Sequence, residues 1–344
     1  MGWMKDEIGL EKTQANFVPL TPLSHLQRAA KVFPTSTAVV YNNHRVNYAE
    51  YHARCSQLAS ALIDVGVKPG SVVATILPNV PAQAEAHFGV PACGAVLNTI
   101  NTRLDVDTVS YIFNHGEAKV VLVDTQFLSL AESACAEVDG NAPLIIEVPD
   151  PSAGFQSSGK YITYEQFLSS GDEKFDWLMP QDEWESLALN YTSGTTGRPK
   201  GVVYHHRGAY LMTMGTVVSW RMQIFPVFLT IVPLFHCNGW NHTWLMPMVG
   251  GKLVCCREIS ASAIYSAISD EKVAFFGGAP IVLNLIVNSD QKERKHFDHK
   301  VEVFTAGAPP APATLDKMEK LGFNVTQVYG CLLYTSPSPR DPRE

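Results

Sequence analysis

The residues best suited to chemistry lie in one loop, residues 191–201, which reads YTSGTTGRPKG. Hydroxyl side chains and the backbone N–H groups beside glycines can donate hydrogen bonds to phosphate oxygens, and Lys200 adds a fixed positive charge. The candidate donors and their neighbours are Thr192, Ser193, Gly194, Thr195, Thr196 and Gly197. A Walker loop is excluded here, because no GK pair is followed by Ser or Thr. An ordinary surface linker gives no reason to combine three glycines with Pro199 and Lys200 and then to enter a strand.

A second candidate is His236, in the stretch FHCNGW at residues 235–240. A single histidine in an apolar segment is either packed in the core or placed at a functional site, and the surrounding motif favours a functional site. Trp240 keeps two interpretations, because a large indole either fills the core or borders a ligand. A metal site with Cys237 and His242 is not predicted, since no further ligand lies at a suitable spacing.

Three short stretches complete the candidates. Gly277 and Gly278, before Ala279-Pro280, predict the turn at a helix start, and their small size would also leave room for a ligand. Residues 307–309 are either a simple turn or a ligand loop beyond the carboxyl end of a strand. Residues 205–207, His-His-Arg, are interpreted as a solvated strand end, with a contact to an anionic ligand as the alternative.

Strands and helices that alternate along the chain must position these residues. A hairpin is predicted over 38–48, then a helix that begins with a capping box at Asn47 and Glu50 and ends at Gly66. Hydrophobic periodicity predicts further strands over 72–77, 95–98, 119–124, 187–191, 201–204, 228–232, 252–256, 273–276, 301–306 and 324–329. It predicts further helices over 81–94, 105–116, 207–220, 260–271, 280–289 and 311–321. Strands that are apolar on both faces, such as VVLV at 120–123, belong in a parallel sheet covered by helices.

The fold class expected from this pattern is α/β, with two layered units in tandem. The first unit covers residues 15–186 and the second covers 187–330. Residues 149–160, PDPSAGFQSSGK, are rich in Pro, Gly and Ser and are predicted to form a flexible joint. Residues 331–344 show neither strand nor helix spacing, and a foreign or disordered tail is expected there.

Composition excludes several classes of protein. With 344 residues, 46% of them hydrophobic, the chain has too much apolar surface to be disordered, and 24 Gly and 22 Pro argue against a coiled coil. A net charge of -7 provides no basic surface for nucleic acid. Seven cysteines without CxxC pairs suit reduced thiols, and the N-terminus lacks the pattern of a secretion signal. The most apolar window, 224–235, is too short to span a bilayer and is expected to be a buried strand leading into a loop.

The loop at 191–201 resembles the phosphate-loop signature of the adenylate-forming superfamily, which includes acyl- and aryl-CoA synthetases. FHCNGW is similar to the second motif of short- and medium-chain fatty acyl-CoA synthetases and of plant acyl-activating enzymes. TAGAPP at 305–310 resembles the adenine-contacting loop, and QVYG at 327–330 resembles the start of the next motif. ANFVPL at 15–20 and NTINTRL at 98–104 also resemble that subgroup.

The resemblance implies a two-step reaction with ATP, Mg²⁺ and CoA, in which a carboxylic acid is first adenylated and then transferred to CoA. Lys200, His236 and Thr196 would be catalytic, His236 at the junction of carboxylate and α-phosphate. Trp240, Gly277 and Gly278 would border the acyl group. The residues implied in nucleotide binding are Thr192, Ser193, Gly194, Thr195, Thr196, Gly197, Lys200, Gly307, Ala308, Pro309, Gln327, Tyr329 and Gly330. No residue of this chain is expected to ligate a metal ion.

After Gly330 the sequence departs from the family pattern, because Cys331-Leu332-Leu333 stands where a small residue, Thr and a magnesium-binding Glu are expected. The chain is therefore expected to represent two α/β subdomains, without the family's β-barrel subdomain and C-terminal domain, and to be inactive by itself. The expected function is that of a short- or medium-chain fatty acyl-CoA ligase. An aryl-acid ligase acting on cinnamate-like acids and a non-catalytic nucleotide-binding remnant are the alternatives. A cytoplasmic location is expected, with the peroxisome as the alternative, and no nucleic acid or transmembrane partner is implied.

Overall fold

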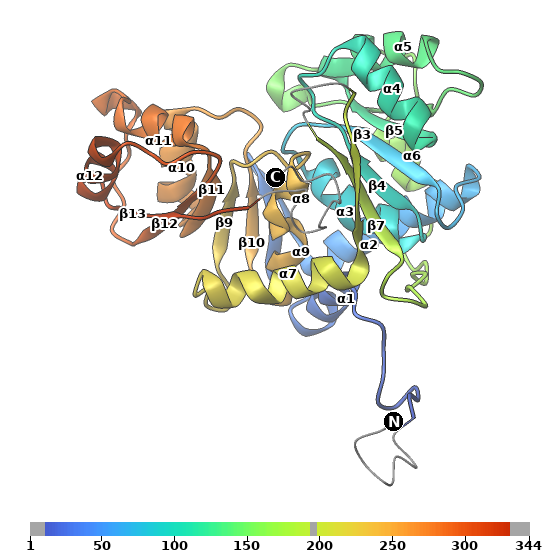
Figure 1. Ribbon diagram of the computed structural model, residues 1–344, viewed down its shortest axis with the longest axis horizontal. Helices are drawn as coiled ribbons and strands as arrows, with labels where there is room; N and C mark the ends of the chain where they lie inside the picture. Colours follow the sequence, from blue (N-terminus) through green and yellow to red (C-terminus); the bar gives the residue numbers. More distant parts are fainter. Residues whose placement is uncertain (1–10, 193–197, 331–344) are drawn as a thin grey trace, which may run out of the picture.

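The computed structural model describes residues 11–192 and 198–330, which form two β-sheets separated and flanked by helices (Figure 1). The predicted α/β class is confirmed. Residues 193–197, in the centre of the predicted phosphate loop, and the tail at 331–344 lie outside the described residues.

The first sheet has the strand order β6-β5-β3-β4-β7-β8. Its strands are parallel except for β8, which runs antiparallel to β7. Their bounds are β3 (Val72–Ile76), β4 (Val96–Thr99), β5 (Ala118–Asp124), β6 (Leu144–Val148), β7 (Ser186–Tyr191) and β8 (Gly201–His205).

The second sheet has the order β13-β12-β11-β9-β10-β1-β2 and is parallel except for the β1–β2 hairpin. Its strands are β1 (Thr37–Tyr41), β2 (His44–Asn47), β9 (Val227–Thr230), β10 (Lys252–Cys255), β11 (Phe275–Gly278), β12 (Val301–Thr305) and β13 (Phe323–Gln327). Since β9 to β13 are parallel, their carboxyl ends meet at one edge of the sheet.

The α-helices that connect these strands are α1 (Leu23–Val32), α2 (Tyr48–Asp64), α3 (Pro81–Ala92), α4 (Val106–Gly116), α5 (Leu128–Ala136), α6 (Tyr164–Ser169), α7 (His206–Ser219), α8 (Cys237–Trp240), α9 (His242–Met248), α10 (Ala261–Glu271), α11 (Pro280–Val287) and α12 (Pro312–Lys320). The start of α2 follows the prediction, because Asn47 and Glu50 form the reciprocal capping box. Gly66, just after α2, has φ +90°, which suits the predicted left-handed cap.

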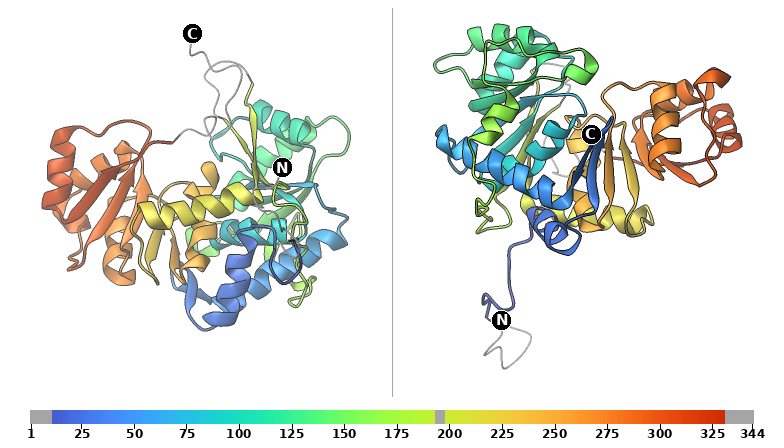
Figure 2. Two further views of the ribbon diagram at one scale, coloured as in Figure 1. Left: turned by 60° about the horizontal axis from the view of Figure 1, so that its bottom comes forward. Right: turned by 180° about the vertical axis from the view of Figure 1, so that it is seen from behind.

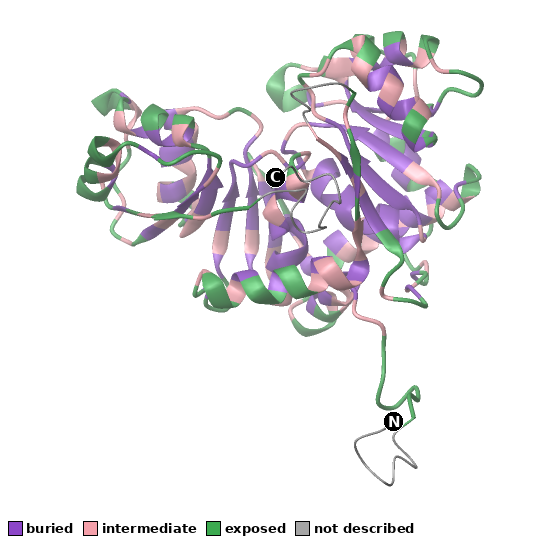
Figure 3. Cartoon of the chain, in the orientation of Figure 1, coloured by how far each residue is buried: buried purple, intermediate pink, exposed green. Residues whose placement is uncertain are grey.

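The chain folds as five alternating layers, helix–sheet–helix–sheet–helix. Neighbouring strand residues face opposite layers, so Val39 packs in the central core while Val40 packs under the outer helices of the second sheet. Helices α4 and α5 cover the outer face of the first sheet, and α10, α11 and α12 cover the outer face of the second. Helix α3 contacts β3 and β4 on one side and β1 on the other, so the middle layer serves both sheets (Figure 2). Figure 3 shows the buried strands on either side of this layer.

The expected boundary between residues 186 and 187 does not coincide with the division between the sheets. The early hairpin β1–β2 joins the second sheet by pairing with β10, and β7 and β8 join the first sheet by pairing with β4. The prediction grouped strands by their order along the chain, whereas parallel pairing through the shared helix layer brings together strands that are far apart in sequence.

The segment 149–160 is not a joint between two units, because β6 before it and β7 after it belong to the same sheet. It is also anchored locally. Asp150 and Phe155 form a backbone bridge, and the Glu147 carboxylate accepts hydrogen bonds from Ser157 and Ser158. The Pro-, Gly- and Ser-rich composition reflects turns that need special backbone angles, such as φ +87° at Gly154.

Helices α1, α5, α6, α8 and α9 and strand β6 were not predicted from the sequence. Helix α9 contains Pro247, and α6 has only six residues, so neither presents a long periodic pattern. The apolar window at 224–235 contains β9, but Ile224 and Phe225 before it are exposed. Among the described residues, no helix is long and apolar enough to cross a membrane.

Candidate functional site

The ends of the predicted phosphate loop are held together as a hairpin between β7 and β8. Tyr191 pairs with Gly201, and the Thr192 N–H donates to the Lys200 carbonyl at 3.0 Å. The Lys200 N–H donates in turn to the Thr192 hydroxyl at 3.2 Å. Lys200 is exposed, so its ammonium group is available to an anion. Ser193, Gly194, Thr195, Thr196 and Gly197 lie outside the described residues, so their predicted phosphate contacts stay predictions.

Helix α4 supports one side of this hairpin. The Tyr191 hydroxyl lies 2.8 Å from His115 Nδ1, and the Arg198 guanidinium lies 5.0 Å from the centre of the Tyr111 ring. Partial burial is the main cause that raises the pKa of Tyr191 to about 12, so its hydroxyl stays protonated and can donate to His115. Sequence reasoning missed Tyr111 and His115, because nothing in the spacing of α4 shows that its last turn would face β7.

His236 lies in a tight turn with an unusual backbone. Five successive residues, 237–241, have positive φ between 48° and 64°, and only Gly239 among them is a glycine. A left-handed conformation costs a residue with a Cβ about 1–2 kcal/mol, so contacts around the turn must offset this cost. The His236 residue is exposed at the surface. The protein that surrounds the rest of its side chain still excludes enough water to lower the pKa of the imidazole.

A chain of buried polar side chains joins this turn to the phosphate-loop strand. Asn190, two residues before Thr192, donates from its amide to Asn238 Oδ1 at 2.8 Å. The Asn238 amide lies 3.3 Å from His87 Nε2 on α3, and His87 Nδ1 donates to the Gln83 carbonyl at 2.7 Å. Burial lowers the pKa of His87 to about 4, so the ring is neutral and its Nε2 accepts from Asn238.

Trp240 packs directly over Gly277. A Cβ at Gly277 would lie 2.7 Å from the indole, so only glycine fits beneath this ring. The Trp240 ring also meets Trp220 edge-on at 6.2 Å, and Trp220 stacks on Phe304 at 3.6 Å. The structure therefore brings Trp240 and Gly277 together, as an aromatic wall at the carboxyl end of β11. A Cβ at Gly278 would instead approach the Val282 side chain at 3.2 Å.

The residues that resemble adenine-site motifs follow β12 and β13. Gly307 has φ +96° and, with Ala308 and Pro309, is exposed just beyond the end of β12. Gln327 ends β13, and the Val328 N–H donates to the Thr305 carbonyl at 2.8 Å, which ties the two strand ends together. Tyr329 is 84% exposed, so its ring is open to a stacking partner, and Gly330 beside it is exposed.

These motifs lie beyond the carboxyl ends of β7, β9, β11, β12 and β13, with α8 between the two sheets (Figure 1). Open α/β sheets bind ligands at such edges. The chemistry fits a nucleotide, because the hydroxyl and ammonium groups of Thr192 and Lys200 suit phosphates and the exposed Tyr329 ring suits a base. The buried Thr305 hydroxyl has no hydrogen-bond partner among residues 11–192 and 198–330. In the part of the chain that the structure describes, no group of three His, Cys, Asp or Glu side chains could hold a metal ion.

Residues 205–207 do not form a solvated strand end. His206 is buried and lies 2.8 Å from the Thr21 hydroxyl, and burial lowers its pKa to about 4. His205 caps α7 by accepting from the Gly208 N–H, and Arg207 forms an ion pair with Glu183. These side chains are used in packing and capping, which leaves none of the three poised for an anionic ligand. His242 is also buried, stacked at 3.9 Å on Phe228.

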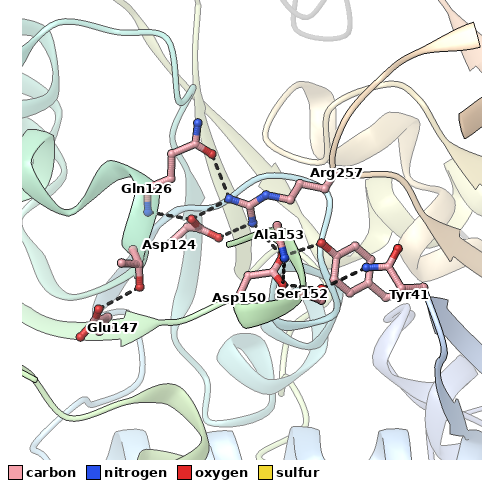
Figure 4. Close-up of polar contacts among 10 residues, drawn as sticks. Tyr41, Asp124, Gln126, Glu147, Asp150, Ser152, Ala153 and Arg257 are labelled. Carbon is pink, nitrogen blue, oxygen red and sulfur yellow. Dashed lines mark hydrogen bonds and ion pairs between the residues drawn. The ribbon is translucent and has the colours of Figure 1, made fainter. Parts of the chain in front are cut away.

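A second polar junction fixes the two sheets further from the loop (Figure 4). Arg257, just after β10, bonds to Asp124 at the end of β5 at 2.6 and 2.9 Å and to Asp150 at 3.1 Å. The Tyr41 hydroxyl on β1 donates to Asp150 at 2.5 Å. Burial opposes the charge on Asp150, but hydrogen bonds from Tyr41 and Ser152 and the Arg257 charge outweigh it, so the pKa of this carboxyl is lowered. None of these residues was predicted, because their partners are far apart in the sequence.

The fold and the arrangement of the motifs are those of an α/β protein of the adenylate-forming type. The chain belongs to the AMP-binding enzyme family, whose model matches residues 26–331. It is 43% identical to the peroxisomal acetate/butyrate–CoA ligase of Arabidopsis thaliana over 346 aligned positions, which cover 97% of this chain and 61% of that protein. It is also 43% identical to an acetate–CoA ligase of Humulus lupulus, with the same coverage. The chain thus spans about three fifths of the length of the curated relatives it matches.

Solved structures agree with this fold. The N-terminal domain of FACL13 from Mycobacterium tuberculosis superposes with a TM-score of 0.78 at 23% identity, covering 90% of this chain and 76% of that one. A long-chain-fatty-acid–CoA ligase from Archaeoglobus fulgidus superposes with a TM-score of 0.81 at 22% identity, covering 92% of this chain and 65% of that one. At these identities the match concerns the fold alone.

Proposed function

We propose that this chain forms the nucleotide- and acid-binding part of an ATP-dependent acid–thiol ligase. The observation that carries the proposal is the buried hydrogen bond between Asn190 and Asn238, which holds the phosphate-loop strand beside the His236 turn. A phosphate-binding loop and a group able to meet a carboxylate are thereby held at one place. This is the arrangement that joining a carboxylic acid to ATP requires.

In the first step, a carboxylate oxygen bonds to the α-phosphorus of ATP, and the bond from that phosphorus to the pyrophosphate oxygen breaks. Both reactants are anions, so the protein contributes mainly positioning and charge neutralisation. Thr192, with Ser193, Gly194, Thr195, Thr196 and Gly197, holds the β- and γ-phosphates in this proposal, and Lys200 stabilises the charge on the leaving pyrophosphate. Mg²⁺, when bound together with ATP, would supply further charge neutralisation.

The remaining roles follow the same scheme. His236 contacts the junction between carboxylate and α-phosphate, and its neutral ring can donate one hydrogen bond there. Adenine lies by Tyr329 and the loop formed by Gly307, Ala308 and Pro309, with Gln327 and Gly330 beside it. In the second step the CoA thiolate bonds to the acyl carbon and AMP leaves.

A short- or medium-chain fatty acid is the substrate class that we favour. Trp240 over Gly277 restricts the space at the carboxyl end of β11, which suits a small acyl group. The relatives named for acetate, butyrate and 2-methylpropanoate support the same choice. The alternative is an aryl acid, because a trans-cinnamate–CoA ligase of Petunia hybrida is 40% identical over 93% of this chain.

ATP–pyrophosphate exchange with a panel of acids tests this choice on the full-length gene product. Exchange driven by acetate, butyrate and hexanoate supports the fatty-acid assignment, whereas exchange driven only by aromatic acids overturns it. A transcript that stops after codon 344 and a product that binds AMP without exchange would instead support a non-catalytic nucleotide-binding remnant.

The 344-residue chain alone is proposed to form little or no acyl-CoA, since the relatives extend well beyond the matched region. Robust turnover by this chain would refute that view. For location, we propose the cytoplasm, with the peroxisome as the alternative that the names of two relatives support. Fluorescent tagging of the full-length gene product in its own cells distinguishes the two.

A further inference from the structure

We propose that Asn238 is a positioning residue whose side-chain amide sets where His236 stands relative to the phosphate-loop strand. The catalytic meaning of this role rests on the proposed function, whereas the positioning itself does not. Asn238 is fully buried, so its side chain is not open to a ligand bound at the surface. It acts through its neighbours in the turn.

The amide of Asn238 is bonded on both sides. Its Oδ1 accepts from Asn190 on β7 at 2.8 Å, and its Nδ2 faces His87 Nε2 on α3 at 3.3 Å. His87 is held in turn by its Nδ1 bond to the Gln83 carbonyl and by the Trp244 indole, which donates to the His87 carbonyl at 2.8 Å. Asn238 thus links the first sheet, the middle helix layer and the His236 turn.

The amide of Asn238 satisfies both neighbours. The position must accept a hydrogen bond from Asn190 and donate one to the neutral His87 ring. A carboxylate of the same shape would turn an oxygen toward the Nε2 lone pair, and an aliphatic side chain would leave both neighbours without a partner in a buried site. Asparagine also tolerates the left-handed backbone, φ 50°, found here.

Bonds on the other side of His236 complete the link. The Thr99 hydroxyl lies 3.2 Å from the Phe235 carbonyl and 3.1 Å from Asn190 Oδ1. Phe235, just before His236, is therefore bonded to β4, and Asn238, two residues after it, is bonded to β7. Asn190 in turn is two residues from Thr192, which closes the phosphate-loop hairpin.

The backbone of the turn would not keep this shape unaided. Left-handed geometry is unfavourable for its non-glycine residues, so the turn is expected to relax toward ordinary angles once its anchors are lost. Asn238 is one of the five left-handed residues, 237–241, and its amide is bonded on both sides. Loss of this anchor is therefore expected to free His236.

The test uses Asn238→Gly in the 344-residue chain, with Asn241→Gly as its matched control. Both positions are buried asparagines with positive φ in the same turn, and glycine suits both backbones. Asn241 Oδ1, however, accepts no hydrogen bond from any residue that the structure describes. The readout is the pKa of His236, measured by NMR titration of its ring, since its pKa reports how far the surrounding protein excludes water.

We expect the pKa of His236 to rise toward the ordinary histidine value in Asn238→Gly and to stay at the wild-type value in Asn241→Gly. Asn190→Ala should reproduce the rise, and the double variant Asn190→Ala/Asn238→Gly should add nothing further, because both changes remove the same bond. An unchanged pKa in Asn238→Gly, or an equal shift in the control, overturns the proposal. If Asn238→Gly does not fold, Asn190→Ala decides by the same criterion.

Binding provides a second readout that separates this proposal from the proposed function. The affinity for butyryl-sulfamoyl adenosine, a stable acyl-adenylate mimic, should fall about tenfold in Asn238→Gly, as for loss of one hydrogen bond to a charged group. The affinity for AMP should stay within about twofold, since AMP lacks the acyl junction that His236 meets. Equal losses for both ligands contradict the positioning role. If the wild-type chain binds neither ligand, the proposed function fails, and the His236 titration still decides the role of Asn238.

Discussion

Gly239 shows how much the His236 turn depends on single residue types. It has φ +58°, and a Cβ at this position would lie 2.5 Å from the Leu234 side chain. Both the backbone angle and the lack of space therefore require glycine. Gly215 in α7 is the opposite case, because nothing lies within 4 Å of its Cβ position and its backbone is helical.

Replacing Gly239 by alanine is expected to lower the free energy of unfolding by about 1–3 kcal/mol, through backbone strain and overlap with Leu234. Gly215→Ala is the control and should leave stability unchanged or raise it by up to about 1 kcal/mol. Urea unfolding followed by circular dichroism measures both. Equal stability of the two variants would contradict the geometry described for the turn.

Lys200 is exposed beside the hairpin that closes the phosphate loop. In the full-length gene product, Lys200→Ala should raise the barrier to adenylate formation by about 1.5–3 kcal/mol, roughly a 10- to 150-fold loss in kcat/KM for pyrophosphate exchange. Arg198→Ala is a useful comparison, because Arg198 lies over the Tyr111 ring. A smaller loss in Lys200→Ala than in Arg198→Ala would argue against the role proposed for Lys200.

At the scale of elements, Glu271 connects three of them. It ends α10 and bonds to Arg45 on β2 and, at 2.8 Å, to Lys252 on β10. Its hydrogen bond from Arg45 is the main cause that lowers the pKa of this carboxyl to about 2, and the Lys252 ammonium contributes further. A carboxyl whose pKa is lower in the folded than in the unfolded chain stabilises the fold above the unfolded value.

The stabilising contribution of Glu271 should therefore be complete at neutral pH and disappear as pH falls from about 4.5 to about 2. Glu271→Gln removes the charge, so this variant should be less stable than the wild type at neutral pH. The difference between the two should shrink through that acidic window. Urea unfolding at several pH values measures it, and a difference that stays constant with pH would rule out the charge as its source.

The phosphate-loop hairpin depends on a second contact between elements. Helix α4 meets β7 through His115 and Tyr191, and a Cβ at Gly116 would lie 3.3 Å from the Tyr191 hydroxyl. The described start of the predicted phosphate loop is therefore held by two elements, because Tyr191 pairs within the first sheet and its hydroxyl meets the last turn of α4.

At the scale of the whole molecule, the arrangement of the two sheets depends on side chains that cross between them. Arg257 is the clearest example, with a side chain 10% exposed against Asp124, which is fully buried. The centre of the Phe155 ring lies 4.6 Å from the Arg257 guanidinium carbon. Removing the cation that pairs with a buried carboxylate lowers the stability of the fold strongly, whereas an exposed ion pair contributes little to stability.

Arg257→Ala is accordingly expected to reduce the free energy of unfolding by about 3–5 kcal/mol. Lys295→Ala, which breaks the exposed pair with Asp270, is the control and should cost at most about 1 kcal/mol. Thermal and urea unfolding of both variants test the contrast. Similar losses in the two variants would show that the junction between the sheets contributes no more than an ordinary surface pair.

Several features of the fold and site could be predicted because their causes are local. The capping box at Asn47 and Glu50, the cap at Gly66 and the alternating strands follow from backbone and periodicity rules that act over a few residues. The two strands that flank the predicted phosphate loop could also be predicted, since the hydroxyls, glycines and Lys200 between them are contiguous.

Features that depend on distant residues could not be predicted in this way. His205 and His206 looked like a solvated strand end, yet His206 is buried against Thr21, nearly two hundred positions earlier. Asn98 and Asn190 carry ordinary turn-forming side chains, and only the pairing of β4 with β7 turns them into parts of a buried polar link.

The sequence by itself determined the α/β class, most of the local elements and the chemical groups of the candidate site, because contiguous residues carry them. Only the tertiary structure decided which strands share a sheet, that residues 149–160 are no joint, and that Asn190, Asn238 and His87 meet. The physical reason is that parallel strands pair across long connections, so the burial and hydrogen bonds of their side chains depend on neighbours that sequence order does not reveal.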